Sequence, residues 1–303
     1  VPFVSINYGT DTSKWGRILI RELLRATERG LGNGETPIFP IQIFKVKEGI
    51  NFNEDDPNVD LFREACRVTG KRLFPNFSFI DAPFNAAYYD GTHESEVAYM
   101  GCRTRVMGNR HGEETSVGRG NLSFSTLNLV KMAIVSESLT DFYRILNRYI
   151  DIGIEQLVAR FEYQCTRRAE EFRFLYTQGV WRGSEQLHIH DEVRDVLKQG
   201  TLSLGFIGLA ETLKVLTGST HAESREAERL GLDIVTHLAD RMRAAAETYD
   251  LNFSLLATPA EGLSGKFVMR DQEAFGIIDG VTNRAFYTNS FHVPVYQTVS
   301  IRE

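Results

Sequence analysis

A single thiol, Cys102, stands between Gly101 and Arg103 in the stretch Tyr99–Thr104. The glycine beside it predicts a loop tip, and the glycine-entered segment Gly118–Leu129 predicts a returning strand. Three roles are open to such a sulfur. It could be a packed small hydrophobe, a thiolate whose pKa is lowered by nearby cations, or a thiyl radical in a dry pocket. Spacing alone does not choose among these roles.

A second polar group, Thr258–Gly265, follows the predicted strand Asn252–Ala257. A strand that ends in a polar, glycine-containing turn exposes backbone N–H groups, and a helical turn beginning there would favour phosphate. A plain turn marked by proline and glycine is the alternative. A third polar stretch, Tyr287–Val295, predicts a loop entering a strand, in which His292 could be structural or catalytic.

Other polar groups predict no site. His188 and His190 are two residues apart, so they would not share a helix face, and we interpret them as a solvated loop pair. The acidic stretch Asn51–Asp60 lacks the spacing of a calcium loop. The glycines of Gly30–Pro37 do not match a phosphate-binding loop, so a turn is predicted there. No metal site is expected in this chain.

The elements that would position these groups alternate between strands and helices. The predicted strands are Val1–Tyr8, Ile38–Val46, Pro75–Ile80, Gly118–Leu129, Thr201–Phe206 and Asn252–Ala257. The predicted helices run from the Gly9–Ser13 turn to about Gly30, from Asn58 to near Gly70, from Ser138 to about Glu171 with Gly153 as a potential break, from Phe206 to Gly218, and over His221–Tyr249.

Two helices carry apolar stripes that predict core faces rather than cofactor sites. The stripe residues are Leu146, Ile150, Ile154, Leu157, Phe161, Leu230, Ile234, Leu238 and Met242. Cys66 and Cys165 fall on predicted helices and are interpreted as packed thiols.

Composition limits the class of protein. The 303 residues suffice for one large α/β domain or two smaller ones. A net charge of −6 with mixed signs disfavours a nucleic-acid binder with a basic face. Three cysteines without a CxxC pair predict neither a zinc cage nor a disulfide framework, and they indicate a reducing compartment. Neither a membrane span nor a signal peptide is predicted.

Many segments, in order along the whole chain, resemble the catalytic core of anaerobic (class III) ribonucleoside-triphosphate reductases, which are glycyl radical enzymes. The segments are Val1–Thr12, Gly32–Pro40, Tyr99–Arg105, Gly118–Leu129, Gly200–Glu211, Asn252–Gly265 and Tyr287–Val295.

The resemblance implies a fold that the alternating pattern alone does not decide. It implies a ten-stranded α/β barrel with a central finger loop that carries Cys102, whereas the pattern also allows an open sheet. No linker divides the chain, so residues 1–303 are expected to be part of one catalytic barrel domain. We expect an internal piece of a longer protein, incomplete at both ends.

The resemblance also implies a reaction and its residues. Cys102, oxidised to a thiyl radical, would remove hydrogen from C3′ of a ribonucleoside triphosphate, and the product would be the deoxynucleotide used in DNA synthesis and repair. Asn121 and Thr104 would contact the ribose. The substrate-binding residues are expected to be Thr258, Ala260, Glu261, Gly262, Ser290 and His292. A carboxylate repels triphosphate, so Glu261 is left to face the ribose or pair with the base.

Cofactors and partners follow from the same resemblance. A glycyl radical, made by a radical-SAM iron–sulfur activating enzyme, and a structural zinc would belong to a C-terminal region that this chain lacks. The reductant would be formate or a dithiol, because the family's partner cysteine is missing here. ATP and deoxynucleotide effectors, a homodimer and a cytoplasmic location are expected. No nucleic-acid or membrane partner is expected, and this piece should not turn over alone.

Two rival functions remain. A relative of pyruvate formate-lyase would also use a finger loop, but that family has adjacent cysteines, whereas Gly101 precedes and Arg103 follows Cys102. A non-catalytic nucleotide-binding homologue would keep the fold, and the presence of Cys102 and Asn121 disfavours it only weakly.

Overall fold

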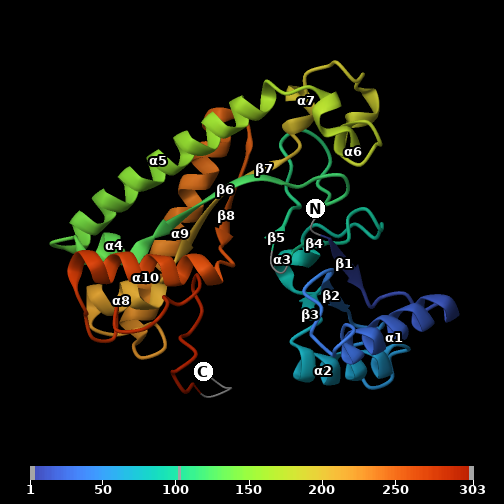
Figure 1. The fold of residues 1–303 in the computed structure, drawn as a ribbon, viewed down its shortest axis with the longest axis horizontal. Helices are drawn as coiled ribbons and strands as arrows, with labels where there is room; N and C mark the ends of the chain where they lie inside the picture. Colours follow the sequence, from blue (N-terminus) through green and yellow to red (C-terminus); the bar gives the residue numbers. More distant parts are fainter. Residues whose placement is uncertain (1–3, 102–103, 300–303) are drawn as a thin grey trace. The chain divides into compact units, whose positions relative to one another are not determined.

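The structure is a computed structural model that describes residues 4–101 and 104–299 (Figure 1). Its contacts divide the chain into two compact units, Val1–Arg119 and Gly120–Glu303, each built around its own parallel sheet. The alternation of strands and helices is confirmed, and the class is mixed α/β. Within the described ranges, no helix combines the length and apolar character needed to cross a bilayer.

The sheet of the first unit has three parallel strands in the order β1 (Ser5–Tyr8), β2 (Ile41–Val46) and β3 (Asn76–Phe79). Parallel strands cannot be joined by a tight turn, so helical crossovers connect them. These crossovers are α1 (Lys14–Arg29) and α2 (Val59–Arg72), which pack side by side (Figure 1).

The helices of the first unit cover one face of its sheet with apolar side chains. The buried members of this core are Ile20, Leu24, Phe44, Val46, Leu61, Ala65 and Val68. Cys66 follows Ala65 on α2, and one residue turns a side chain by about 100° around a helix, away from the buried stripe. Cys66 is exposed, so its prediction as a packed thiol is wrong.

A helical turn and a short hairpin follow β3. After α3 (Pro83–Ala86), strand β4 (Tyr99–Met100) pairs antiparallel with β5 (Thr104–Arg105). Residues 106–120 then run without regular secondary structure to the second unit. This confirms the loop predicted for residues 106–117, whereas the strand predicted from Gly118 begins only at Asn121.

The sheet of the second unit has three parallel strands in the order β6 (Asn121–Asn128), β7 (Thr201–Ile207) and β8 (Asn252–Ala257). Its helices are α4 (Leu129–Ile134), α5 (Leu139–Cys165), η1 (Ala169–Phe172), α6 (Arg173–Tyr176), η2 (Ser184–Gln186), α7 (Arg194–Leu197), α8 (Leu209–Thr217), α9 (Arg225–Tyr249) and α10 (Glu261–Phe275).

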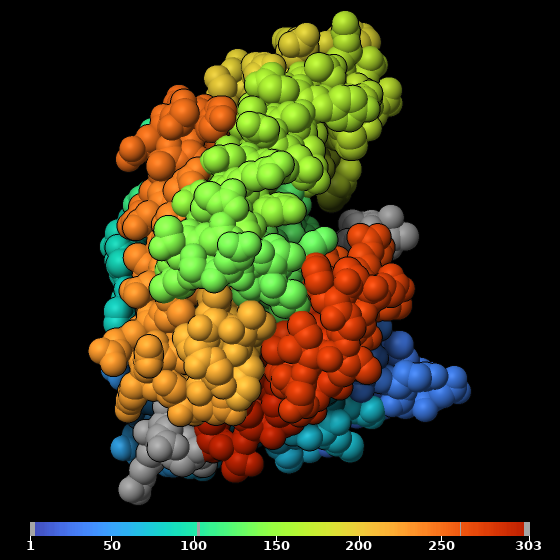
Figure 2. Space-filling model, turned by 90° about the vertical axis from the view of Figure 1, so that its left-hand side faces the viewer, coloured from blue at the N-terminus to red at the C-terminus, as the bar shows by residue number. Residues whose placement is uncertain are grey.

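Helices α5 and α9 cover one face of this sheet, and Figure 2 shows both at the surface, α5 in green and α9 in orange. Helix α5 continues through Gly153, so the potential break there does not occur. A β-carbon on Gly153 would come within 2.7 Å of Leu204 Cδ1 on β7, so the glycine allows the helix to lie close to the strand. Cys165 is buried at the end of α5, as predicted.

Several predicted boundaries are wrong for local reasons. Helix α5 ends at Cys165 rather than Glu171, which lies in the separate helix η1. Helix α9 begins at Arg225 rather than His221, because the Ser224 hydroxyl accepts a hydrogen bond from the Glu226 N–H at 3.2 Å and caps the helix there.

The structure shows the conformation of both predicted polar segments. Helix α10 begins at Glu261, so the prediction of a helical turn beginning within Thr258–Gly265 is confirmed and the plain-turn alternative is wrong. Tyr287–Val295 contains no strand, since its backbone groups bond to α8 and to neighbouring turns. The described strands form two open three-stranded sheets and one hairpin, with no closed barrel among them.

Candidate active site

Cys102 and Arg103 lie outside the described residues, but Gly101 and Thr104 on either side of them are described. Met100 pairs antiparallel with Thr104 in the β4–β5 hairpin. Gly101 has φ of 56°, in the left-handed region that glycine adopts without a steric penalty. Thr104, the predicted ribose contact, is half-buried in β5 of the first unit.

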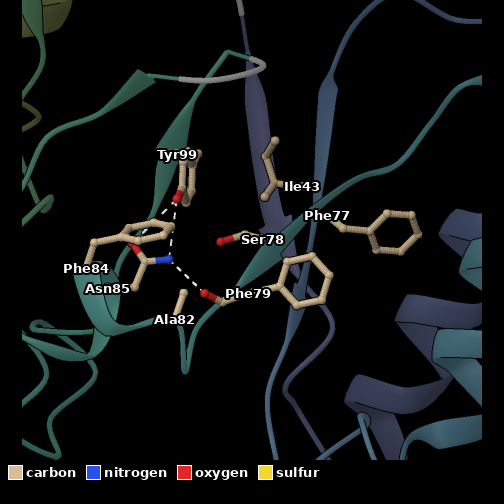
Figure 3. A pocket seen from close by; sticks show the side chains of 8 residues that line it. All are labelled: Ile43, Phe77, Ser78, Phe79, Ala82, Phe84, Asn85 and Tyr99. Atoms are coloured by element: carbon tan, nitrogen blue, oxygen red, sulfur yellow. Dashed lines mark hydrogen bonds between the residues drawn. The ribbon is translucent and has the colours of Figure 1, made fainter. Parts of the chain in front are cut away.

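A cavity of about 300 Å³ opens beside β4 in the first unit (Figure 3). Its wall is mostly apolar, and its lining residues are Ile43, Phe77, Ser78, Phe79, Ala82, Phe84, Asn85 and Tyr99. The Ser78 hydroxyl points into this space, where it is buried and has no hydrogen-bond partner among the described residues. None of the residues predicted from the sequence to form a site lines this cavity.

The sheet of the second unit has one apolar face and one face on which most side chains are polar, with Phe124, Ile207 and Leu256 as apolar members. We call the second one the polar face. Leu202, Leu204 and Phe206 of β7 point into the core on the side of α5 and α9. Side chains alternate along a strand, so Thr201, Ser203 and Gly205 share the opposite face. On that face the Ser203 hydroxyl lies 2.8 Å from the Ser254 hydroxyl of β8.

Asn121 lies on this polar face because of a bulge in β6. Asn121 pairs with Thr201 and Ser123 pairs with Leu202, so Leu122 is an extra residue in the ladder. A bulge changes the face to which the following side chains point. Without this bulge, Asn121 and Thr126 would point to opposite faces of the sheet. The Oδ1 atom of Asn121 is buried and accepts no hydrogen bond from the described residues.

Thr258 lies at the carboxyl end of the same face. It is fully buried, and its Oγ1 atom is 3.2 Å from Oγ1 of Thr126, which is opposite Gly205 in the ladder. Asn121 pairs with Thr201 of β7, and Thr126 pairs with Gly205, four residues further along the same strand. The separation of Asn121 and Thr126 along the strand direction is therefore four residues. At about 3.3 Å per residue this distance is ~13 Å. One polar face thus connects Asn121 to the Thr258 turn.

Helix α10 begins directly after this turn. Ala260 is its N-cap residue and makes no side-chain capping bond, and the first N–H groups of a helix have no partner within the helix. A β-carbon on Gly262 would meet nothing within 4 Å, so the space there is open. The side chain of Glu261 lies outside what the structure describes. This end of α10 carries the partial positive charge that favours anions.

The segment that contains Ser290 and His292 holds the Thr258 turn in place from outside the sheet. Ser290 is fully buried and its hydroxyl donates to the Thr258 carbonyl oxygen at 3.2 Å. The Ala260 N–H donates to Oδ1 of Asn289 at 3.3 Å. His292 is exposed, stacks on Phe291 and lies 2.9 Å from the Asn289 carbonyl oxygen through Nδ1. Ser290 therefore supports the turn, whereas the hydrogen bond of His292 goes to Asn289 of its own segment.

The sequence prediction missed a buried polar network that anchors this segment. The Glu211 carboxylate oxygen Oε1 accepts hydrogen bonds from the Thr288 N–H at 2.9 Å and hydroxyl at 2.6 Å. Burial raises the pKa of Glu211, although the Thr288 hydrogen bonds offset part of this. Tyr287, also fully buried, donates its hydroxyl to Asp271 at 2.9 Å. No periodicity marks Glu211 as buried, since it lies in the first turn of a short helix.

The described residues contain no group of three or more histidine, cysteine, aspartate or glutamate side chains placed to hold a metal ion. His190 lies 3.3 Å from Glu170, but this pair is at the surface. The polar groups that converge in the second unit are hydroxyls, an amide and helix N–H groups, which suit a ligand with sugar hydroxyls and an anionic group.

Comparison with known proteins identifies the family. The model of the anaerobic ribonucleoside-triphosphate reductase family matches residues 1–303. The chain belongs to this family. Its resemblance to the family, noted on seven segments of the sequence, is therefore confirmed.

The matched relatives are longer than this chain. The anaerobic ribonucleoside-triphosphate reductase of Haemophilus influenzae is 33% identical over 304 residues, which are 99% of this chain and 42% of that protein. The enzyme of that name from Escherichia coli K12 is 32% identical over 306 residues, again 42% of its length. That of bacteriophage T4 is 33% identical over 309 residues and 48% of its length. The chain thus spans less than half of these relatives.

Solved structures support the fold. The anaerobic ribonucleotide reductase of Thermotoga maritima with citrate in the active site matches with a TM-score of 0.66 at 16% identity, covering 99% of this chain and 53% of that chain. The same enzyme in complex with dATP and CTP matches with a TM-score of 0.61 at 16% identity, covering 94% of this chain and 42% of that chain.

Proposed function

We propose that this chain is the catalytic core of an enzyme that reduces ribonucleoside triphosphates to deoxyribonucleoside triphosphates under anaerobic conditions, for DNA synthesis and repair. Family membership over all 303 residues supports the activity. The observation that carries the substrate assignment is the polar face of the β6–β8 sheet. It bears an unpartnered amide oxygen on Asn121 and, ~13 Å along the strands, the Thr258 turn before α10.

A ribonucleotide bound along this face would supply hydrogen-bond partners to Asn121 at one end and to the Thr258 turn at the other. Its ribose hydroxyls would donate to Asn121 Oδ1, which otherwise leaves a buried acceptor unpaired at a cost of about 1–3 kcal/mol. Its phosphates would lie on the turn Thr258–Gly262 and on the first N–H groups of α10, where the helix dipole favours negative charge. Thr104 and His292 are kept as proposed contacts, and Glu261 as a residue facing the ribose or base.

The chemistry we propose centres on Cys102. In the full-length protein a glycyl radical would supply the oxidant that forms a thiyl radical at this sulfur. The sulfur takes the hydrogen atom from C3′ of the ribose, and the 2′-hydroxyl then leaves as water after protonation. Formate or a dithiol supplies the reducing electrons, and Cys102 returns a hydrogen atom to C3′.

The remaining features belong to the whole protein. We propose that the two units are parts of one ten-stranded barrel domain with the β4–β5 hairpin as its finger loop. We further propose a radical-SAM activating enzyme, a structural zinc site beyond this chain, a homodimer and a cytoplasmic location. ATP and deoxynucleotides are the proposed effectors, in keeping with the Thermotoga maritima enzyme that was solved with dATP bound in the specificity site.

Replacement of Cys102 in the activated full-length protein tests the proposal. Cys102→Ala should bind ribonucleoside triphosphates normally and yield no deoxynucleotide. The matched control is Cys66→Ala, which removes an exposed thiol from α2 and should leave turnover unchanged. Deoxynucleotide formation by Cys102→Ala would remove this residue, and with it the proposed reaction.

A further inference from the structure

Strand β4, which leads into Cys102, is attached to the sheet of the first unit through a side chain of β1. The amide nitrogen of Asn7 donates to the Tyr99 carbonyl oxygen at 2.9 Å, and the Tyr99 N–H donates to Oδ1 of Asn7 at 2.9 Å. A backbone carbonyl only accepts and a backbone N–H only donates, so both bonds together fix the orientation of the amide. The side-chain amide of Asn7 thus makes the same pair of hydrogen bonds to the Tyr99 backbone that a neighbouring strand would make.

A second residue of β1 continues this attachment toward the thiol. The Gly101 N–H donates to the Ser5 hydroxyl at 3.0 Å. Ser5 and Asn7 are two residues apart on a strand, so their side chains point to the same face. The next residue, Tyr8, points to the opposite face and stacks edge-on against Phe44 in the core. The two polar residues of β1 therefore hold the strand that leads to Cys102, up to the residue before it.

The other strand of the hairpin has its own anchor. Asn85 is 2% exposed, donates to the Phe79 carbonyl oxygen at 2.8 Å and accepts from the Arg105 guanidinium at 2.8 Å. Arg105 lies on β5, so Asn85 ties that strand to the end of β3. Figure 3 shows Asn85 beneath Tyr99, whose hydroxyl is 3.4 Å from the Asn85 amide nitrogen.

We infer that Asn7 is a positioning residue for Cys102, with Asn85 as the second anchor of the same hairpin. This inference rests on the proposed function. A two-residue strand pair is too short to hold itself in place, and transfer of a hydrogen atom requires the reacting atoms at about 3–3.5 Å. Side-chain bonds from the rigid sheet supply the support that β4 and β5 lack. No sequence motif marks Asn7, beyond a polar residue alternating with apolar ones in β1.

The test uses the full-length protein with Asn7→Ala, which removes both bonds to Tyr99. In the activated protein, kcat for deoxynucleotide formation should fall by ~10- to 100-fold, because misplacement by about 1 Å can cost that much. KM and nucleotide affinity should change by much less than kcat, since Thr104 is the one proposed substrate contact on this hairpin and the others lie in the second unit. The matched control is Asn53→Ala, which truncates an exposed asparagine of the same unit and should change none of these values.

A second measurement is independent of turnover. In the full-length protein before activation, iodoacetamide alkylation is followed by mass spectrometry for each cysteine peptide. Asn7→Ala should change the rate at Cys102 by ~3-fold or more, because the hairpin that carries this thiol loses its attachment to the sheet, and should leave exposed Cys66 and buried Cys165 unchanged. Asn85→Ala should act in the same direction.

The outcomes separate the two proposals. Unchanged Cys102 alkylation and unchanged kcat in Asn7→Ala would overturn the positioning role while Cys102→Ala remains inactive. A rise at Cys165 would show general loosening of the fold and would also overturn it. Activity in Cys102→Ala would instead overturn the proposed reaction.

Discussion

Thr258 Oγ1 occupies the place that a side chain on Gly205 would take. A β-carbon on Gly205 would come within 1.8 Å of this oxygen. Gly205 lies on β7 opposite Thr126, so the hydroxyls of Thr126 and Thr258 meet across the missing side chain. The turn before α10 can therefore fold back over the sheet only where the central strand has a glycine.

This relationship predicts the effect of Gly205→Ala. The added methyl group should displace Thr258, weaken nucleotide binding to the full-length protein by at least ~10-fold, and lower stability by about 1–3 kcal/mol. Urea denaturation and equilibrium binding measure the two effects. Gly70→Ala is the control, because Gly70 lies on α2 with nothing within 4 Å of an added β-carbon. The control should keep affinity and gain up to about 1 kcal/mol. Unchanged binding in Gly205→Ala would show that Thr258 does not hold the ligand.

A second glycine is predicted to control Asn121. A β-carbon on Gly200 would come within 2.4 Å of Cγ of Leu122, the extra residue of the β6 bulge. Gly200→Ala should therefore shift the bulge, turn Asn121 from the polar face and lower kcat by ~10-fold or more, since orientation of the reacting group is lost. Gly32→Ala, where an added β-carbon meets nothing within 4 Å, is the control. Normal turnover in Gly200→Ala would argue against a role of Asn121 on the ribose.

Glu211 should make stability depend on pH. Burial raises the pKa of this carboxyl in the folded protein above the value of about 4.3 in the unfolded chain. The folded state then holds the proton more tightly. The stabilising contribution is complete below the unfolded pKa and is lost as pH rises through the folded pKa.

Glu211→Gln mimics the protonated form and should abolish this dependence. The variant should match the wild type at acid pH and become relatively more stable as pH rises, by up to about 1.4 kcal/mol per pH unit between the two pKa values. Urea denaturation of both full-length proteins at a series of pH values measures the difference. A stability difference that does not vary with pH would mean that folding does not raise the pKa of Glu211.

The two described thiols should react at different rates. Cys66 is exposed on α2, whereas Cys165 is buried and burial raises its pKa to about 11, which leaves little thiolate at neutral pH. Iodoacetamide should therefore alkylate Cys66 at least ~10-fold faster than Cys165 in the folded protein. Equal rates in native buffer, with both slower than in urea, would contradict the burial of Cys165.

The sequence predicts those parts of the fold that depend on local pattern. The stripe Leu146, Ile150, Leu157 and Phe161 is buried on α5, and Gly218 ends α8 with φ of 81°. These outcomes follow from helical periodicity and from the backbone freedom of glycine, both of which can be read within a few residues.

Features that depend on distant residues could not be predicted. The face of Asn121 is set by a bulge, and that bulge needs Gly200 nearly eighty residues later in the chain. The regular alternation of side chains along a strand therefore assigns Asn121 to the wrong face of the sheet. The order of apolar and polar residues in Tyr287–Val295 resembles that of a strand. In the structure, however, the side chains of Tyr287 and Thr288 donate hydrogen bonds to Asp271 and Glu211. Cys66 differs from buried Ala65 by one helical position only.

The fate of the C3′ hydrogen tests the proposed reaction most directly. The activated full-length protein would be given a ribonucleoside triphosphate that carries deuterium at C3′, and the deoxynucleotide product analysed by mass spectrometry and NMR. Removal and return of this atom by Cys102 predicts slower turnover than with unlabelled substrate and product that keeps deuterium at C3′. Product formed at an equal rate, with its C3′ hydrogen drawn from solvent, would contradict hydrogen transfer through Cys102.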